Sequence, residues 1–80
     1  MRLPRDLSGE DLAARLTGLG YHVTRQTGSH LRLTTEQGGE YHITIPRHAT
    51  LRIGTLSAIV SDVAQHHHFD RDALLTLLFS

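Results

Sequence analysis

Three short runs in which apolar and polar side chains alternate constrain the fold of this chain more than any other feature. They span residues 21–26, 30–35 and 40–46, and turn segments that contain glycine separate them at 27–29 and 37–39. Alternation with a period of two is typical of a strand with one covered and one open face, and connections this short join neighbouring strands as hairpins. The pattern therefore predicts a three-stranded antiparallel sheet.

The side chains of each run divide between the two faces of the predicted sheet. In the second and third runs one face is apolar and carries Leu31, Leu33, Tyr41, Ile43 and Ile45. The opposite face carries His30, Arg32, Thr34, His42 and Thr44, and nothing in the sequence covers it. In the first run, strict alternation places Tyr21, Val23 and Arg25 on one face and His22, Thr24 and Gln26 on the other. We therefore expect a polar sheet face that is open to a ligand.

Helical signals flank the three runs on both sides. Ser8 is suited to cap a first helix, and Gly18 and Gly20 are suited to end it, with Gly20 in the left-handed conformation. Thr55 is suited to cap a second helix that runs to about residue 65, and Asp70 to cap a short third one. The expected fold is α+β, a single domain over residues 1–80 with the order α-β-β-β-α, helices on one face of the sheet and an extra short C-terminal helix.

Composition excludes several classes of protein. Eighty residues suffice for one domain with a small core, and the absence of cysteine removes disulfides, thiolate nucleophiles and cysteine-based metal sites. No apolar run approaches the roughly 20 residues of a membrane span, and the first residues lack the apolar stretch of a signal peptide. We therefore expect a cytoplasmic protein without membrane attachment.

Charge is balanced overall but unevenly distributed. The net charge is zero, and all eight cations are arginines. Residues 25–52 carry Arg25, Arg32, Arg47 and Arg52 against two acids, whereas residues 53–80 carry one arginine against three acids. Because the guanidinium group binds phosphate with two parallel hydrogen bonds, this distribution favours a phosphate-binding surface in the middle third. Scattered solubilising charge explains the same counts.

Seven histidines raise the question of metal binding. Three of them, His66-His67-His68, lie between two predicted helices, where neighbouring rings point in different directions. The chain also lacks a His-x-x-x-His pair on a helix. We therefore predict no physiological metal site and no cofactor, and only accidental affinity for nickel or zinc.

Ser29 beside His30 raises the question of nucleophilic catalysis. Adjacent side chains at a turn and a strand start are expected to point apart, and no Gly-x-Ser-x-Gly motif is present. Ser29 is therefore interpreted as a turn residue next to Gly28, which is free to take a positive φ.

Phosphodiester chemistry fits the open face better. An imidazole with an ordinary pKa of about 6.5 can take or give a proton near neutral pH, and RNA carries its own nucleophile in the 2′-hydroxyl. His30 shares its face with Arg32, which is suited to phosphate, and the glycine turn lets a ligand approach the backbone closely. An exposed strand histidine without a function explains the same pattern, so the residues alone leave His30 as a candidate.

Taken together, the motifs resemble the HicA family of bacterial toxins, small mRNA interferases that are encoded beside a HicB antitoxin. The resemblance covers nearly the whole chain in the family's order, through segments 7–9, 19–21, 25–30, 45–48 and 52–56. The combination of a Gly-Ser-His turn, a Pro-x-His loop and a Gly-Thr-Leu helix start is its most specific element. It implies a fold similar to the double-stranded RNA-binding domain and endoribonuclease activity on mRNA.

The resemblance also implies roles for particular residues and a partner. The catalytic histidine of the Gly-Ser-His turn is His30 in this sequence. Thr27 stands where the family commonly has a lysine, so one phosphate contact is lost or transferred to Arg25 or Arg32. A HicB-like antitoxin is the implied protein partner, and we expect no direct binding to DNA.

The predicted RNA-binding residues lie around His30 and in the loop that precedes the second long helix. They are Arg25, Gly28, Ser29, Arg32, Arg47, His48 and Arg52. His48 remains open between a second proton carrier, an RNA contact and a hydrogen bond within its loop. Two alternatives to a ribonuclease also stay open: a non-catalytic RNA-binding module of the same fold, and a protein-binding domain that uses the C-terminal leucines.

Overall fold

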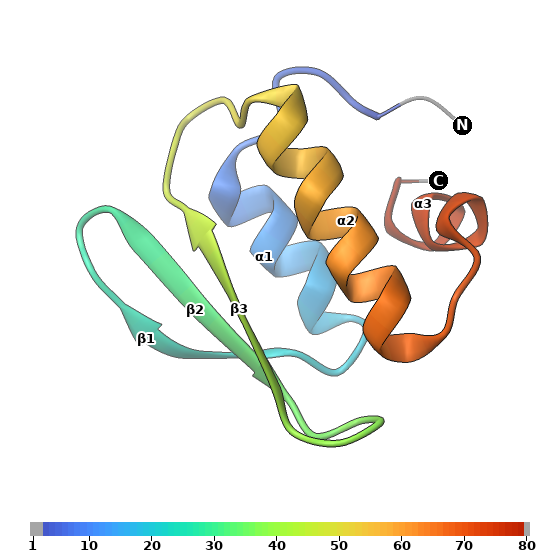
Figure 1. Ribbon diagram of the computed structural model, residues 1–80. Helices are drawn as coiled ribbons and strands as arrows, with labels where there is room; N and C mark the ends of the chain where they lie inside the picture. The colour runs from blue at the N-terminus through green and yellow to red at the C-terminus, as the bar shows by residue number, and fades with distance from the viewer. Residues whose placement is uncertain (1–2, 80) are drawn as a thin grey trace.

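The computed structural model describes residues 3–79, so Met1, Arg2 and Ser80 of the predicted domain lie outside the described residues. The described chain forms three helices and three strands in the predicted order, α-β-β-β-α-α. Their bounds are α1 Gly9–Thr17, β1 His22–Gln26, β2 His30–Thr35, β3 Tyr41–Pro46, α2 Ile53–His67 and α3 Arg71–Phe79. Figure 1 shows α1 and α2 on the same side of the sheet, with α3 beyond α2. The predicted α+β class is confirmed.

The sheet is antiparallel with the strand order β1-β2-β3, as predicted. Leu31 pairs with Ile45 and Leu33 with Ile43, so the apolar side chains of β2 and β3 lie on one face. These four residues are buried in a single hydrophobic core that also includes the inner residues of all three helices. Because the helices cover this face, the polar face of β2 and β3 stays open, as the alternation predicts.

A β-bulge in β1 changes which side chains reach the open face. Val23 pairs with Leu33, but Arg25 pairs with Arg32, so Thr24 is an extra residue in the ladder. Beyond the bulge every side chain changes face, because the pleat has a period of two. The prediction that Arg25 shares a face with Val23 is therefore wrong: Arg25 lies opposite Arg32 on the open face, and Gln26 lies opposite Leu31.

Helix α1 has the predicted cap and the predicted end. The Asp11 N–H donates a hydrogen bond to Ser8 Oγ over 3.0 Å, which satisfies one of the free donors of the first turn. The helix ends at Thr17, and Gly20 takes the left-handed conformation with a φ of 95°. This glycine redirects the chain toward Tyr21, which is fully buried.

Helix α2 begins earlier and ends later than the capping pattern predicts. Its N-cap is Arg52, whose side chain makes no capping hydrogen bond, and Thr55 lies inside the first turn. The start is set by tertiary contact instead, because Leu51 is buried and its N–H donates to the Leu7 carbonyl over 2.7 Å. Since the helix runs to His67, the histidine triplet ends the helix and does not lie between two helices.

The short C-terminal helix is present as predicted. Asp70 Oδ2 accepts a hydrogen bond from the Ala73 N–H over 3.2 Å and so caps the first turn of α3. Leu74, Leu75 and Leu78 are buried against the core, whereas Leu77 is 61% exposed. Most of the C-terminal leucines therefore complete the core. No helix within residues 3–79 combines the length and the apolar character that crossing a membrane requires.

Two of the clustered histidines join α2 to the rest of the fold. His67 Nε2 lies 2.9 Å from the hydroxyl of Tyr21. His66 stacks on Tyr41, with ring centroids 4.3 Å apart, and donates through Nε2 to the Gln37 carbonyl over 3.0 Å. The His66 contacts hold the C-terminal end of α2 against the β2–β3 turn, and the His67 contact holds it against the residue that precedes β1. Within residues 3–79, no group of three histidine or acidic side chains is arranged to hold a metal ion.

The contact between His67 and Tyr21 makes stability depend on pH. Burial raises the pKa of Tyr21 to about 12, so its hydroxyl stays protonated and can donate to His67. Burial, and then the charge of His66, lower the pKa of His67 below its ordinary value. The unfolded chain therefore binds a proton at His67 more readily than the folded chain, and stability falls as pH drops below about 6.5.

We expect a His67→Gln variant to lose less stability than the wild type when the pH falls from about 7.5 to about 5.5. Glutamine does not titrate and can still accept a hydrogen bond from Tyr21. Urea unfolding at the two pH values measures the difference, with His22→Gln as a matched control because His22 is an exposed strand residue. Equal losses in the wild type and His67→Gln would contradict this explanation.

Candidate functional site

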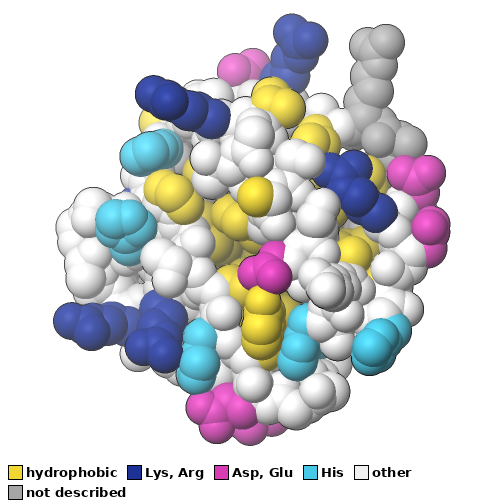
Figure 2. All heavy atoms as spheres, in the orientation of Figure 1, with side chains coloured by type: hydrophobic (Ala, Val, Ile, Leu, Met, Phe, Trp, Pro, Cys, Tyr) yellow, Lys and Arg dark blue, Asp and Glu magenta, His cyan; other side chains and the backbone are white. Residues whose placement is uncertain are grey.

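The open face of the sheet contains a hollow of about 370 Å³. Its walls come from all three strands and from the β1–β2 turn, and they consist of Arg25, Thr27, His30, Arg32, His42 and Thr44. Arg25 reaches this hollow only because the bulge in β1 turns it to the open face. Figure 2 shows arginine and histidine side chains gathered along the side of the molecule where the sheet lies in Figure 1.

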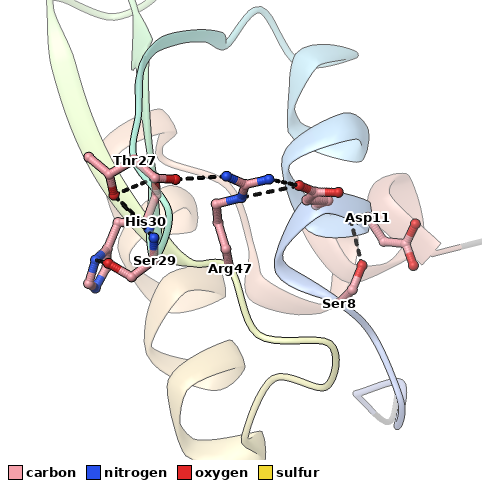
Figure 3. Close-up of polar contacts among 7 residues, drawn as sticks. Ser8, Asp11, Thr27, Ser29, His30 and Arg47 are labelled. Atoms are coloured by element: carbon pink, nitrogen blue, oxygen red, sulfur yellow. Dashed lines mark hydrogen bonds and ion pairs between the residues drawn. The ribbon is translucent and has the colours of Figure 1, made fainter.

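The β1–β2 turn is built by a threonine hydroxyl. Thr27 Oγ1 accepts a hydrogen bond from the His30 N–H over 3.0 Å and a longer one from the Ser29 N–H over 3.3 Å (Figure 3). The Thr27 N–H donates to the His30 carbonyl over 3.0 Å and closes the hairpin. Local bonds of this kind let Ser and Thr hydroxyls shape turns. His30 is thereby held at the first position of β2.

Gly28 does not use its freedom to take a positive φ. The residues with positive φ within 3–79 are Asp6, Gly20, Gly38, Gly39 and His68. The turn closes without a left-handed residue because Thr27 ties down the N–H groups that follow it. No atom lies within 4 Å of where a Gly28 Cβ would stand, so its backbone is open to solvent.

Ser29 and His30 face each other, contrary to the prediction that they point apart. Ser29 Oγ lies 2.9 Å from His30 Nδ1 (Figure 3). The alternation of a strand does not apply to Ser29, because it precedes the first residue of β2. This contact orients the ring, and no other side chain within residues 3–79 makes a hydrogen bond to the imidazole of His30. Nε2 is therefore the ring nitrogen that can meet a ligand.

The two arginines of the hollow are placed to bind an anion. Arg25 and Arg32 are paired residues of β1 and β2, and both side chains line the hollow beside His30. Neither guanidinium has a hydrogen-bond or ion-pair partner among the residues that the structure describes. A phosphate group suits two such adjacent guanidinium groups.

Comparison with known protein families supports the family resemblance that the sequence motifs suggest. The family model described as the HicA toxin of bacterial toxin-antitoxin systems matches residues 9–65. The chain belongs to this HicA family. The match extends from the start of α1 almost to the end of α2 and includes every residue that lines the hollow. No curated protein and no solved structure is similar enough to the chain to count as a match.

The hollow of this HicA toxin is lined by two of the seven predicted RNA-binding residues and leaves out five: Gly28, Ser29, Arg47, His48 and Arg52. Arg47 donates through Nη2 to Glu10 over 2.6 Å and through Nη1 to the Thr27 carbonyl over 2.7 Å (Figure 3). It therefore ties the β1–β2 turn to α1. His48 is exposed in the following loop, and Arg52 is exposed at the start of α2. RNA contact by these residues stays a prediction.

The sequence prediction of the HicA site also missed three residues of the hollow, Thr27, His42 and Thr44. The alternation of β3 places His42 and Thr44 on the open face and was the available signal. The role of Thr27 as the acceptor of the turn depends on side-chain geometry, which no local pattern specifies.

Replacing Thr27 with valine is expected to destabilise this HicA toxin by about 1 kcal/mol, as the loss of a capping hydroxyl does elsewhere. Valine keeps the shape of the side chain but cannot accept the N–H groups of Ser29 and His30. Thr27→Ser keeps the hydroxyl, so its free energy of unfolding should lie within about 0.5 kcal/mol of the wild-type value. Urea unfolding of the three proteins checks this order, and equal stability of the valine variant would refute it.

Proposed function

We propose that this HicA toxin is an endoribonuclease that cleaves mRNA without a metal ion, with His30 as its catalytic residue. The observation that carries the proposal is one arrangement of charge and geometry. A histidine whose Nδ1 is held by Ser29 lies in the same hollow as the unpartnered cations Arg25 and Arg32. Metal-free cleavage of RNA requires a group that transfers protons and groups that stabilise the charge on the phosphate, and this hollow contains both kinds.

In the proposed reaction the 2′-hydroxyl of the RNA attacks the adjacent phosphorus. His30 Nε2 takes the proton of that hydroxyl as the bond from O2′ to phosphorus forms and the bond from phosphorus to O5′ breaks. The leaving O5′ takes a proton from solvent or from the imidazolium. Arg25 and Arg32 stabilise the charge that develops on the phosphoryl oxygens. The products are a 2′,3′-cyclic phosphate and a 5′-hydroxyl.

The surroundings of His30 suit this role. The hydrogen bond with Ser29 fixes the orientation of the ring, so the same nitrogen faces the substrate in every encounter. The open backbone at Gly28 lets an RNA chain approach the turn without a steric barrier. His30 itself is exposed, so long RNA can reach it on the face that no helix covers.

The proposed partner is a HicB-like antitoxin that covers this face. An active ribonuclease must be restrained in its own cell, and the hollow offers two cations without internal partners. An acidic or polar segment placed against Arg25 and Arg32 would neutralise them and block His30 at the same time.

A single-turnover assay with a long, unstructured RNA and EDTA tests the proposal. We expect cleavage in EDTA, and we expect the 5′ ends of the products to accept phosphate from a kinase without prior phosphatase treatment. Products with a 5′-phosphate and a 3′-hydroxyl would contradict the route through the 2′-hydroxyl. Cleavage that EDTA abolishes would contradict metal independence.

A second candidate function is RNA binding without cleavage. It is favoured by Thr27, which supplies no cation at the turn, and by a net charge of zero. In that case the affinity for RNA should fall as salt concentration rises, because bound phosphates release counterions, while no cleavage products form.

A further inference from the structure

The open face continues beyond His30 into a second hollow of about 520 Å³. This hollow is lined by Thr24, Arg25, Arg32, Thr34, Glu40 and His42. It shares Arg25, Arg32 and His42 with the first hollow, so the two form one groove across the sheet. His30 lies at one end of the groove and Glu40 lines the other.

A chain of hydrogen bonds crosses all three strands beneath the far end of this groove. Thr24 Oγ1 lies 2.9 Å from Thr34 Oγ1, and Thr34 Oγ1 lies 2.7 Å from His42 Nδ1. His42 Nε2 lies 3.0 Å from Glu40 Oε2. The chain is anchored in the sheet because Thr34 is only 8% exposed. It holds the Glu40 carboxylate in a defined place beside the groove.

These hydrogen bonds occupy only one of the two carboxylate oxygens of Glu40. An uncharged imidazole carries one N–H, so when His42 Nε2 donates to Glu40, Nδ1 accepts from Thr34 Oγ1, which can itself accept from Thr24 Oγ1. Glu40 then accepts from His42 Nε2 through Oε2. Among the residues that the structure describes, Oε1 of Glu40 has no hydrogen-bond partner. A ligand in the groove can therefore donate to Oε1.

The charge of Glu40 determines which part of an RNA fits there. Glu40 is the acid that lines the groove, and its carboxylate repels the phosphate groups that Arg25 and Arg32 attract. A carboxylate accepts readily from the exocyclic amine of a nucleobase, as it does from N4 of cytosine. Uracil has no such amine. It presents carbonyl oxygens on both sides of its ring N–H, and these oxygens face the carboxylate unfavourably.

We propose that Glu40, held by His42 and Thr34, forms a nucleobase subsite that selects a base with an exocyclic amine over uracil. This inference rests on the proposed function, because the groove joins the subsite to His30. His30 and Thr34 are four residues apart on β2, a distance of about 13 Å along the strand. The subsite therefore reads a base at a fixed position away from the cleaved bond.

Sequencing of cleavage sites in a randomised RNA tests the subsite. For the wild type we expect bases with an amine to exceed uracil about 5- to 10-fold at one fixed position, the size of a single well-placed hydrogen bond. Glu40→Ala should reduce this ratio to about 1 at that position, and Glu40→Gln should change it. Glu36→Gln is the matched control, because Glu36 is an exposed acid outside the groove, and it should keep the wild-type profile.

A binding measurement separates failure of the subsite from failure of the proposed function. His30→Ala should bind oligocytidine about 5- to 10-fold more tightly than oligouridine of the same length at the same salt concentration, and His30→Ala with Glu40→Ala should bind both equally. If the wild type cuts no RNA but this preference holds, the subsite stands and the ribonuclease is refuted. If the wild type cuts RNA and Glu40→Ala has an unchanged profile, the subsite is refuted and the ribonuclease stands.

Discussion

Replacing His30 with alanine is expected to lower the single-turnover rate of RNA cleavage by about 10²- to 10⁴-fold, the usual contribution of a general acid or base. The variant loses the ring whose Nδ1 is held by Ser29, and with it the nitrogen that faces the hollow. Arg25 and Arg32 remain, so affinity for RNA should change far less than the rate. The measurement is the cleavage rate with enzyme in excess, in parallel with RNA binding.

The loss of activity must be separated from a loss of folding. His30 is exposed, so its removal should change the free energy of unfolding by no more than about 0.5 kcal/mol. His22→Ala is the matched control, because His22 is also an exposed strand histidine but lies outside the hollow, and it should cleave at the wild-type rate. A folded His30→Ala protein that cleaves RNA as fast as the wild type would overturn the proposed role of His30.

Replacing Gly9 with alanine is expected to have the largest effect on stability, about 2–4 kcal/mol, from steric overlap and a lost hydrogen bond. A Cβ on Gly9 would overlap the carbonyl oxygen of Pro46 and would lie 3.3 Å from Arg47 Cα. These are backbone atoms and cannot rotate away. The Gly9 N–H also donates to the His48 carbonyl over 3.0 Å, so moving α1 outward breaks this bond as well.

The effect of this substitution should extend to the site, because Pro46 pairs with His30 in the sheet. Gly54→Ala is the matched control: Gly54 also lies in the first turn of a helix, and no atom lies within 4 Å of its would-be Cβ. It should be as stable as the wild type or more stable by up to about 1 kcal/mol. In thermal unfolding, the melting temperature of Gly9→Ala should lie roughly 10–30 °C below that of the wild type. Equal melting temperatures for the two alanine variants would show that α1 tolerates the displacement.

Local patterns in the sequence predicted most of the fold and part of the site. The alternation of β2 and β3 placed His30 and Arg32 on an open face, and the capping residues Ser8 and Asp70 located two helix starts. These features depend on residues that are neighbours in the sequence, because side-chain periodicity and helix caps are set within one or two turns or one strand. The same motifs pointed to the HicA family, which the family match establishes.

The tertiary structure decided the features that depend on contacts between distant segments. The bulge in β1, which brings Arg25 beside Arg32, follows from pairing with β2 and has no signature in the alternation of β1 alone. The start of α2 follows from the bond between Leu51 and Leu7, which overrides the capping preference of Thr55. Arg47 binds Glu10 across 37 positions of the chain and so lies outside the hollow.

Some features follow from the local sequence and others only from the tertiary structure, for one physical reason. A strand's period or a helix cap is decided by the backbone geometry of a few consecutive residues, so the sequence alone determines it. Which face a bulged strand presents, and which partner a long arginine side chain reaches, depend on how whole elements pack. Packing is settled by the summed burial of a core whose members, such as Tyr21, Leu33, Leu56 and Leu74, come from every part of the chain.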